Sequence, residues 1–327
     1  MQAVVFDQPG DEDVLRVAEV PAPDLGVGEV RIAVTGAGVN RADLLQRKGL
    51  YPPPPGASEI IGLECAGTIT ETGAGIDDLA VGDRVMALLA GGGYATEIVV
   101  PSVCAMRTPE DFTDLEAAAV PEVFITAFIN LFLIGGLDSN STVLVHGGSG
   151  GVGTAAIQLA KSAEARVFVT AGSDDRCRAC LELGADAAFN YRESDFLTCA
   201  LDATAGRGVD VVLDCIGGDY FDRHLDVLAP DGRLVVIGLQ GGARAEIDLV
   251  RLMRKRLTVT GSTLRAKPAE EKGRIIGEFI RRFGPDLVTG AIRPVVDRVL
   301  PLEEVAEAHR LLAAGEIFGK LVLECPR

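Results

Sequence analysis

The sequence predicts an α/β chain in which a mainly β domain is joined to a doubly wound parallel sheet with helices on both faces. Two observations support this fold class. The first part of the chain consists of short apolar segments broken by turn residues, whereas from Ser141 apolar strands alternate with amphipathic helices. Strands spaced by helices form parallel sheets that are covered on both faces. At 327 residues the chain is also longer than one core usually supports.

The first domain is expected to cover residues 1–121. Its predicted strands are separated by turn signals and lie at 2–7, 15–20, 29–39, 65–73, 83–89 and 94–100. In this part only RADLLQRKG, residues 41–49, has the pattern of a helix. The first domain is therefore predicted to be mainly β.

The second domain is expected to cover residues 122–264. Its predicted strands lie at 142–146, 166–170, 186–191, 209–217, 232–239 and 257–263. Helical patterns separate most of them, which is the order found in doubly wound nucleotide-binding domains. The apolar stretch 117–136 is long enough to suggest a membrane span, but it contains Pro121, Glu122 and Asn130, which are costly in lipid. A buried helix that joins the two domains fits this stretch better.

The last segment, residues 265–327, is expected to return to the first domain and complete it. It is predicted to form a helix at 269–284, a strand at 292–300, a helix at 302–315 and a final strand at 319–325.

Composition excludes several classes of partner. The formal net charge of -16 argues against nucleic acid and against anionic membranes, because binding a phosphate backbone requires clustered Lys and Arg. The seven cysteines are an odd number and are scattered, several of them in apolar runs, which favours a reduced protein. The N-terminal segment MQAVVFDQPG lacks the pattern of a signal peptide. A cytoplasmic location is expected.

The strongest local signal is a glycine-rich turn between an apolar strand and a helix, at Gly148-Ser149-Gly150-Gly151-Val152-Gly153. Gly148 and Gly150 would permit a tight turn and close approach of the backbone to a pyrophosphate. Gly153 would let the helix pack closely on the strand, and the first N–H groups of the helix would bind the phosphates. The alternative is a turn that is merely rich in glycine. The strand and helix units that follow favour the dinucleotide-binding interpretation.

The next strand end distinguishes the nicotinamide cofactors. NAD sites place an acidic residue at this point, about twenty residues after the glycines, to bind the ribose 2′-hydroxyl. Here the strand ends in Ala171-Gly172-Ser173, and Arg176 follows, whose guanidinium suits a 2′-phosphate. NADPH is therefore expected, with contacts from Ser173 and Arg176. Asp174 and Asp175 keep NAD as an alternative cofactor, because an acid one or two residues further on could bind the ribose. The other interpretation is that both aspartates cap the next helix.

Several further motifs extend over the whole chain. They are GVNRAD at 38–43, GLYPPPP at 49–55, GLECAG at 62–67, GDRV at 82–85, GGYATE at 92–97, HGGSGGVG at 146–153, NYR at 190–192 and GK at 319–320. With these motifs the sequence resembles the zinc-free quinone oxidoreductase branch of the medium-chain dehydrogenase/reductase superfamily. The resemblance implies a GroES-like catalytic domain, a Rossmann domain that binds NADPH, and a homodimer.

The same resemblance implies that no metal takes part in the reaction. Zinc-dependent members place metal ligands at positions that here hold Asn40, Leu63 and Glu122, and these do not form a zinc site. The four-cysteine structural zinc lobe of those members is also missing, since Cys104 stands alone near its place. Cys177 and Cys180 lie three residues apart on a predicted helix without a second pair, which disfavours a metal or redox role.

By resemblance, the catalytic residues are Asn40, Asp43 and Tyr51, in a cleft beside the nicotinamide. Asn40 would donate to the acceptor oxygen as charge develops there, and Tyr51 would orient the acceptor or pass a proton. From the residues alone, Asn40 is equally well explained as a turn residue and Asp43 as a helix-start acid. Further cofactor contacts implied by position are Thr126, Tyr191, Ile237, Gly238, Leu239, Phe318, Gly319 and Lys320.

The function predicted is hydride transfer from NADPH to a quinone or a related α,β-unsaturated carbonyl, which is electrophilic enough without a metal. One alternative is an enoyl-thioester reductase, which would need basic residues for a pantetheine-phosphate tail; in the first domain only Arg41, Arg47 and Lys48 suggest such a group. Another alternative is a non-catalytic, crystallin-like NADPH-binding protein or an RNA-binding protein. The acidic chain contains no Trp and four Tyr, which disfavours RNA.

Overall fold

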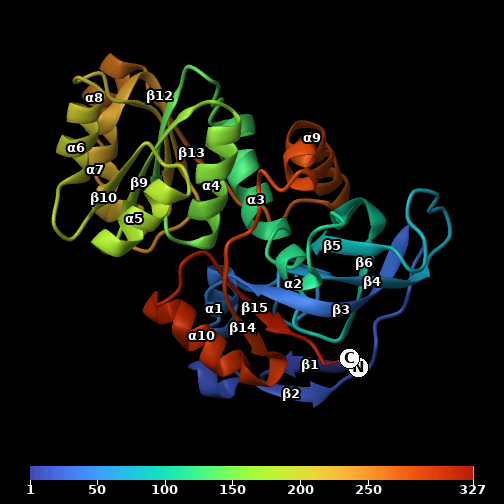
Figure 1. Cartoon of the computed structure of the whole chain (residues 1–327). Helices are drawn as coiled ribbons and strands as arrows, with labels where there is room; N and C mark the ends of the chain where they lie inside the picture. The colour runs from blue at the N-terminus through green and yellow to red at the C-terminus, as the bar shows by residue number, and fades with distance from the viewer. Residues whose placement is uncertain (327) are drawn as a thin grey trace. The chain divides into compact units, whose positions relative to one another are not determined.

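The computed structural model describes residues 1–326. The chain divides into two compact units. The first unit consists of Met1–Ile125 together with Leu264–Arg327, and the second unit consists of Thr126–Thr263. Figure 1 shows the elements of each unit.

The first unit is built on a mixed sheet in the order β14-β15-β3-β4-β5-β7, with β6 paired to β3. Its strands are β3 (Glu29–Val39), β4 (Glu64–Thr72), β5 (Arg84–Leu88), β6 (Glu97–Pro101), β7 (Ala105–Arg107), β14 (Val296–Pro301) and β15 (Lys320–Glu324). A separate antiparallel pair is formed by β1 (Gln2–Val5) and β2 (Arg16–Glu19). The last strand, β15, pairs antiparallel with β3, so the C-terminal segment forms part of the sheet of the first unit.

The helices of the first unit are α1 (Arg41–Arg47), α2 (Asp114–Ala117), α9 (Ala269–Val288) and α10 (Val305–Ala314), with 3-10 turns η1 (Glu12–Val14), η2 (Ser102–Cys104) and η4 (Leu302–Glu304). Helix α9 continues past Gly284, where the sequence predicts its end. Phe279, Phe283 and Leu287 are all buried, so the apolar face repeats every four residues beyond the glycine.

The second unit contains an all-parallel sheet in the order β10-β9-β8-β11-β12-β13. Its strands are β8 (Thr142–His146), β9 (Arg166–Ala171), β10 (Ala187–Asn190), β11 (Val209–Asp214), β12 (Leu228–Val236) and β13 (Thr258–Gly261). The order reverses between β8 and β11, and ligands of doubly wound sheets bind at the carboxyl ends of the strands at such a reversal. This sheet and the mainly β first unit confirm the predicted α/β fold class.

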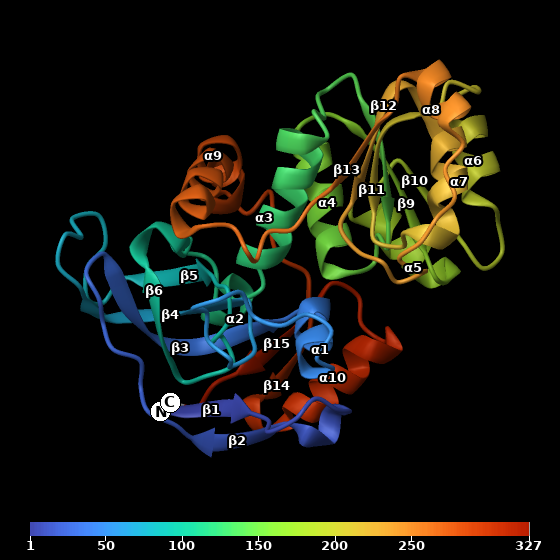
Figure 2. The ribbon, with the colours of Figure 1, turned by 180° about the vertical axis from the view of Figure 1, so that it is seen from behind.

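Helices cover both faces of this sheet. They are α4 (Gly151–Ser162), α5 (Asp174–Glu182), α6 (Phe196–Ala203), α7 (Gly218–Val227) and α8 (Leu249–Lys255). In both views of the ribbon, α6, α7 and α8 lie on one face and α4 lies on the other (Figures 1 and 2). Helix α8 was not predicted; it spans only seven residues, and none of them is fully buried.

The apolar stretch 117–136 contains helix α3 (Pro121–Phe128) and a π-helical segment η3 (Ile129–Ile134). Glu122 lies in the first turn of α3, and Asn130 is buried, where its side-chain amide donates to the Thr126 carbonyl oxygen at 2.7 Å. No helix within residues 1–326 combines the length and the apolar character needed to cross a membrane.

Candidate functional site

The glycine-rich turn follows β8 and leads into α4. A Cβ on Gly153 would lie 2.2 Å from the carbonyl oxygen of Gly147, and a Cβ on Gly148 would lie 2.5 Å from the Cβ of Val169 on β9. At Gly150 the nearest atom to an added Cβ would be 3.5 Å away. Gly148 and Gly153 therefore leave no space for a side chain, whereas a Cβ on Gly150 would make only an ordinary van der Waals contact.

Helix α4 begins at this turn without a side-chain cap. Gly150 is its N-cap residue, and no side chain accepts a hydrogen bond from the first turn. The first N–H groups of a helix lack partners within the helix and carry the positive end of its dipole. Together with the exposed backbone at Gly150, they form a surface that fits a pyrophosphate.

The end of β9 has the composition expected of an NADPH site. Ser173 is the N-cap of α5, and its hydroxyl oxygen accepts a hydrogen bond from Arg176 N at 3.4 Å. A Cβ on Gly172 would lie 2.8 Å from the Tyr191 hydroxyl oxygen, so Tyr191 lies directly against the strand end. Ser173, Arg176 and Tyr191 are thus brought to one edge of the sheet.

Asp174 and Asp175, which kept NAD as an alternative cofactor in the sequence, have partners within the protein. The Asp174 carboxylate accepts a hydrogen bond from the Asn190 amide at 2.7 Å, and Asp175 pairs with Arg178 at 3.1 Å. Both belong to the first turn of α5 rather than to the strand end.

The remaining cofactor residues expected in the second unit lie beyond other strand ends or on α3. Ile237, Gly238 and Leu239 directly follow β12, and Ile237 N donates to the Asp214 carbonyl oxygen at the end of β11. Thr126 lies on α3. Phe318, Gly319 and Lys320 belong to the first unit.

A buried ion pair lies within the first unit. Lys320 Nζ lies 2.7 Å from Glu64 Oε1, and it also donates to the Asn40 side-chain oxygen at 2.7 Å and to the Val39 carbonyl oxygen at 2.8 Å. Glu64 is fully buried and Lys320 is 3% exposed. All three protons of the ammonium have protein acceptors, so these contacts hold the Lys320 side chain inside the unit.

Gly38 of β3 makes room for this pair. A Cβ on Gly38 would lie 2.3 Å from Glu64 Oε1. Sequence reasoning missed Glu64 and the side-chain role of Lys320. The signal was present, because opposite charges stand inside the apolar segments GLECAG and GKLVLEC, and a charge in such a segment needs a partner.

The side-chain amide of Asn40 is fully engaged in this cluster. Its nitrogen donates to Glu64 Oε1 at 2.9 Å and to the Gly38 carbonyl oxygen at 3.3 Å, while its oxygen accepts from Lys320. An asparagine amide has two protons to donate. Both therefore have protein acceptors in this structure.

Asp43 lies in the first turn of α1 and is fully buried. Its Oδ2 accepts hydrogen bonds from Asn40 N at 2.7 Å and from the Tyr94 hydroxyl at 3.0 Å, and Tyr94 also lies 3.3 Å from His309 Nε2. Burial raises the pKa of the Asp43 carboxyl to about 6, against the opposing effect of these two hydrogen bonds. Asn40 and Asp43 are thus brought together as one buried group.

Tyr51 is partly exposed and packs with Arg265. The Arg265 guanidinium carbon lies 5.3 Å from the Tyr51 ring centroid, and the group donates to the Tyr51 and Ala90 carbonyl oxygens and to the Gln46 side chain. Burial and the nearby Glu122 raise the pKa of the Tyr51 hydroxyl, and Arg265 opposes them. Arg265, which sequence reasoning did not select, therefore fixes the loop that carries Tyr51.

The positions that hold zinc ligands in zinc-dependent members of the superfamily that the sequence resembles have different chemistry here. Leu63 is 1% exposed and belongs to the core, Asn40 is held by Glu64 and Lys320, and only Glu122 supplies a carboxyl. Among residues 1–326, no three His, Cys, Asp or Glu side chains are grouped so that they could hold a metal ion. The described cysteines are all free thiols.

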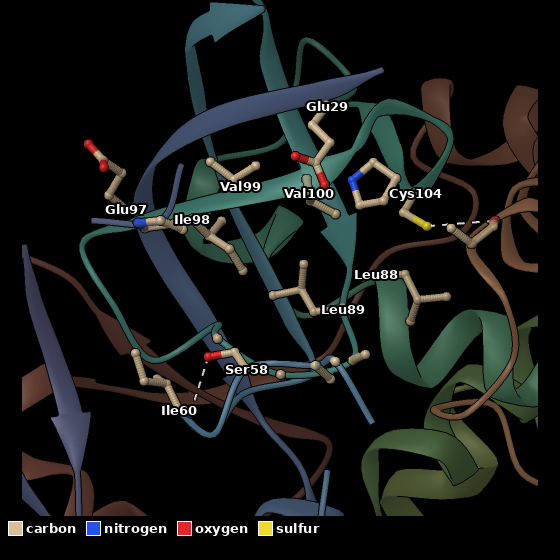
Figure 3. A pocket seen from close by; sticks show the side chains of 18 of the residues that line it. Glu29, Ser58, Ile60, Leu88, Leu89, Glu97, Ile98, Val99, Val100 and Cys104 are labelled. Carbon is tan, nitrogen blue, oxygen red and sulfur yellow. Dashed lines mark hydrogen bonds between the residues drawn. The ribbon is translucent and has the colours of Figure 1, made fainter. Parts of the chain in front are cut away.

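A cavity of about 460 Å³ lies within the first unit (Figure 3). Leu88, Leu89 and Ile98 contribute apolar walls, and the Cys104 thiol donates to the Ala269 carbonyl oxygen at its edge. Lys267 and Lys272 of the C-terminal segment also line it. Lys272 is 4% exposed, and burial lowers the pKa of its ammonium, against the effects of Cys104 and Glu122.

The second unit contains a buried histidine pair that the sequence did not predict. His146 Nε2 lies 2.9 Å from His224 Nε2, and His146 Nδ1 lies 3.0 Å from the Thr170 hydroxyl. Burial lowers the pKa of His146, and it lowers the pKa of His224 to about 3. Both imidazoles are therefore neutral at physiological pH and link β8, β9 and α7.

Two family models match the chain. The alcohol dehydrogenase GroES-like domain matches residues 26–110, and the zinc-binding dehydrogenase family matches residues 151–278. The first range lies within residues 1–121, whereas the second begins within residues 122–264 and continues to residue 278, into the segment expected to return to the first domain.

Curated relatives match over nearly the whole chain. The mycocerosic acid synthase-like polyketide synthase of Mycobacterium tuberculosis is 32% identical over 319 residues, which cover 97% of this chain. The chain spans only 15% of the length of that synthase. The synaptic vesicle membrane protein VAT-1 homolog of Homo sapiens is 35% identical over 323 residues, which cover 94% of this chain and 81% of that protein.

Solved structures also match nearly the whole chain. Escherichia coli quinone oxidoreductase complexed with NADPH has a TM-score of 0.88 and 29% identity, over 99% of this chain and 100% of that chain. CurK enoyl reductase has a TM-score of 0.86 and 28% identity, over 99% of each chain. The two family models, the human relative and these structures confirm the resemblance drawn from the motifs: the chain belongs to the quinone oxidoreductase-type branch of the medium-chain dehydrogenase/reductase superfamily.

Proposed function

We propose that the chain is a cytoplasmic, homodimeric reductase that transfers hydride from NADPH to a quinone or a related α,β-unsaturated carbonyl without a metal. The observation that carries this proposal is the buried Glu64, Lys320 and Asn40 cluster, which uses the amide of Asn40 internally where zinc-dependent members have a metal ligand. Without a Lewis acid, the acceptor must itself be electrophilic, as quinones and enones are.

NADPH fits the residues at the carboxyl edge of the second unit. The N–H groups at the start of α4 would bind the pyrophosphate, while Ser173 and Arg176 would bind the 2′-phosphate and Tyr191 would lie alongside. Thr126, Ile237, Gly238 and Leu239 are proposed as further contacts, together with the backbone at Phe318, Gly319 and Lys320. When bound, NADPH supplies the hydride.

On the acceptor side, Tyr51 is proposed to orient the acceptor through its hydroxyl, with Arg265 fixing its loop. Asn40 and Asp43 act as positioning residues in this proposal, since Asn40 has donated both amide protons within the unit and Asp43 is fully buried. Their role is to hold the Glu64 and Lys320 pair in place.

An enoyl thioester is the second candidate acceptor, and the cavity of Figure 3 is the observation that favours it. Lys267 and Lys272 line this cavity and would add positive charge for an anionic tail, although Lys267 also pairs with Glu271 at 2.5 Å and Lys272 is 4% exposed. The basic residues considered from the sequence, Arg41, Arg47 and Lys48, are not among the residues that line this cavity.

The acceptor is tested by following NADPH oxidation with ortho-quinones, enones and enoyl thioesters under identical conditions. The proposal predicts turnover with quinones or enones. A clear preference for enoyl thioesters, reduced by Lys272→Met, would favour the second candidate. No turnover with any of the three, despite tight NADPH binding, would support a non-catalytic NADPH-binding protein.

A further inference from the structure

Lys272 of α9 is a buried lysine whose side chain has no partner in the protein. The residue is 4% exposed, and among residues 1–326 no acceptor lies within hydrogen-bond or salt-bridge distance of its Nζ. Lys320 is similarly buried, but its ammonium has three protein acceptors. A buried charge is costly when it is neither paired nor well hydrated. The difference indicates that a group from outside the chain completes the surroundings of Lys272.

The ammonium of Lys272 opens on the cavity of Figure 3. Lys272 lines this cavity, and its Nζ is not among the solvent-shielded polar atoms that lack a partner. The small surface that the residue keeps therefore includes the ammonium. Leu88, Leu89 and Ile98 give the same cavity apolar walls. A volume of about 460 Å³, with apolar walls and a few polar groups, is typical of a site for a small molecule.

The other charged side chains that line the cavity have partners in the protein. They are Glu29 with the backbone N–H of Gly26, Glu97 with Arg31, and Lys267 with Glu271. Lys272 is therefore the charged side chain that is left to bind a ligand. One ammonium matches an anion with one negative charge. A phosphate carries nearly two charges and would also meet the two glutamates, so a carboxylate fits this cavity better.

Groups from three other parts of the first unit act on Lys272 without bonding to it. Burial lowers the pKa of the Lys272 ammonium and Arg265 acts in the same direction, whereas Cys104 of η2 and Glu122 of α3 oppose them. A carboxylate bound in the cavity would add negative charge directly at the ammonium. Binding such a ligand would therefore favour the charged form of Lys272.

We propose that this cavity is a binding site for an amphipathic monocarboxylate, a molecule with one carboxylate and a hydrocarbon body. The carboxylate accepts charge-assisted hydrogen bonds from Lys272. The hydrocarbon body packs against Leu88, Leu89 and Ile98, which removes its apolar surface from water. The site does not rest on the proposed function, because binding of this ligand requires neither NADPH nor hydride transfer.

Titration calorimetry with octanoate tests the chemistry of the ligand. Three companion ligands each change one feature: octanol lacks the charge, acetate lacks the chain, and octyl phosphate replaces the carboxylate. We expect one octanoate to bind per chain, and octanol, acetate and octyl phosphate to bind at least about tenfold more weakly, because each loses either the ion pair or the apolar contact or adds charge near Glu29 and Glu97.

Replacing Lys272 tests the residue that binds the carboxylate. Lys272→Met keeps an unbranched side chain and removes the charge. It should weaken octanoate binding by about ten- to a hundredfold, which corresponds to the loss of a hydrogen bond to a charged group. The matched control is Lys48→Met, because Lys48 is exposed and does not line the cavity. This control should bind octanoate as wild type does.

A second measurement uses wild type and so does not depend on how the variants fold. Reductive methylation followed by peptide mass spectrometry should modify Lys272 more slowly when octanoate is bound, and Lys48 at an unchanged rate. The proposal is overturned if octanol binds as tightly as octanoate, if Lys272→Met binds octanoate like wild type, or if octanoate leaves the methylation of Lys272 unchanged. Tighter binding of octyl phosphate would overturn the choice of a carboxylate and favour a tail that ends in phosphate. A chain that binds octanoate through Lys272 but reduces no acceptor would contradict only the proposed function.

Discussion

The position of Asn40 before a helix could be predicted from the sequence, whereas its side-chain contacts could not. The motif around 38–43 identified Asn40 and Asp43 as a pair and left open whether they act on the acceptor or start a helix. In the structure Asn40 precedes α1, Asp43 lies in its first turn, and the amide of Asn40 is bonded to Glu64 and Lys320. Sequence spacing predicts the local turn, but Glu64 and Lys320 are far from Asn40 along the chain, so their contacts could not be predicted.

Replacing Asn40 distinguishes positioning from direct contact with the acceptor. Asn40→Ala leaves Glu64 and Lys320 each without one hydrogen bond inside the core. We expect the free energy of unfolding to fall by about 1.5 to 3 kcal/mol, the usual scale for hydrogen bonds to charged groups. Urea unfolding measures this, with the exposed Asn140→Ala as control. Unchanged stability with a large loss of kcat would instead show that Asn40 donates to the acceptor.

Arg176 should determine the preference between the two nicotinamide cofactors. If its guanidinium binds the 2′-phosphate, Arg176→Ala should weaken NADPH binding by about 1.5 to 3 kcal/mol and leave NADH nearly unchanged, because NADH lacks that phosphate. Titration calorimetry with both cofactors measures the difference. Arg178→Ala, two residues further on and paired with Asp175, is the control. Equal losses for NADPH and NADH would show that Arg176 does not bind the phosphate.

At the scale of elements, the turn from β8 into α4 could be predicted from its glycines and the strand and helix beside them. Which glycine packs against protein and which lies at the proposed phosphate surface could not be predicted. The sequence assigns Gly148 to the phosphate approach, whereas the structure places it against Val169 of the adjacent strand. Which backbone or side chain approaches each Cα depends on how β8, β9 and α4 pack. Of the three motif glycines, Gly150 alone has room for a Cβ, which would lie 3.5 Å from the Gly147 carbonyl oxygen.

This difference predicts opposite effects for two alanine variants. Gly153→Ala places a Cβ against the carbonyl oxygen of Gly147 and should lower the thermal unfolding midpoint, because backbone must move. Gly150→Ala should fold normally and weaken NADPH binding, since the methyl group would occupy the proposed phosphate surface. Thermal unfolding and NADPH titration of both variants test this. Normal stability of Gly153→Ala would contradict the packing described here.

The His146 and His224 pair joins a strand and a helix, and it should make stability depend on pH. The pKa of His224 is lowered from its ordinary value of 6.5 to about 3 in the folded chain, so the unfolded chain binds more protons between these values. Stability is therefore lost as the pH falls below about 6.5, by up to about 1.4 kcal/mol per pH unit for each such histidine. His224→Gln should show a shallower loss in urea unfolding between pH 7 and pH 5. An identical slope would mean that His224 is already protonated in the folded chain.

At the scale of the whole molecule, periodicity and turn residues predicted the fold class because both sheets have strong sequence signals. The continuous apolar strands of the parallel sheet and the alternation with helices set its architecture. Helix α8 was not predicted; it spans only seven residues, and none of them is fully buried. The candidate site was predicted in part, since its motif residues were found, whereas Glu64, Arg265 and Lys272 depend on contacts between distant segments.

Metal-free reduction is the central claim, and metal removal tests it most directly. The protein is dialysed against a strong chelator, its metal content is measured, and NADPH oxidation is followed with an ortho-quinone and an enone before and after treatment. The account predicts unchanged turnover in protein that contains far less than one metal ion per chain, because Asn40, Leu63 and Glu122 do not form a metal site. Loss of most of the activity on chelation, restored by added zinc, would contradict it.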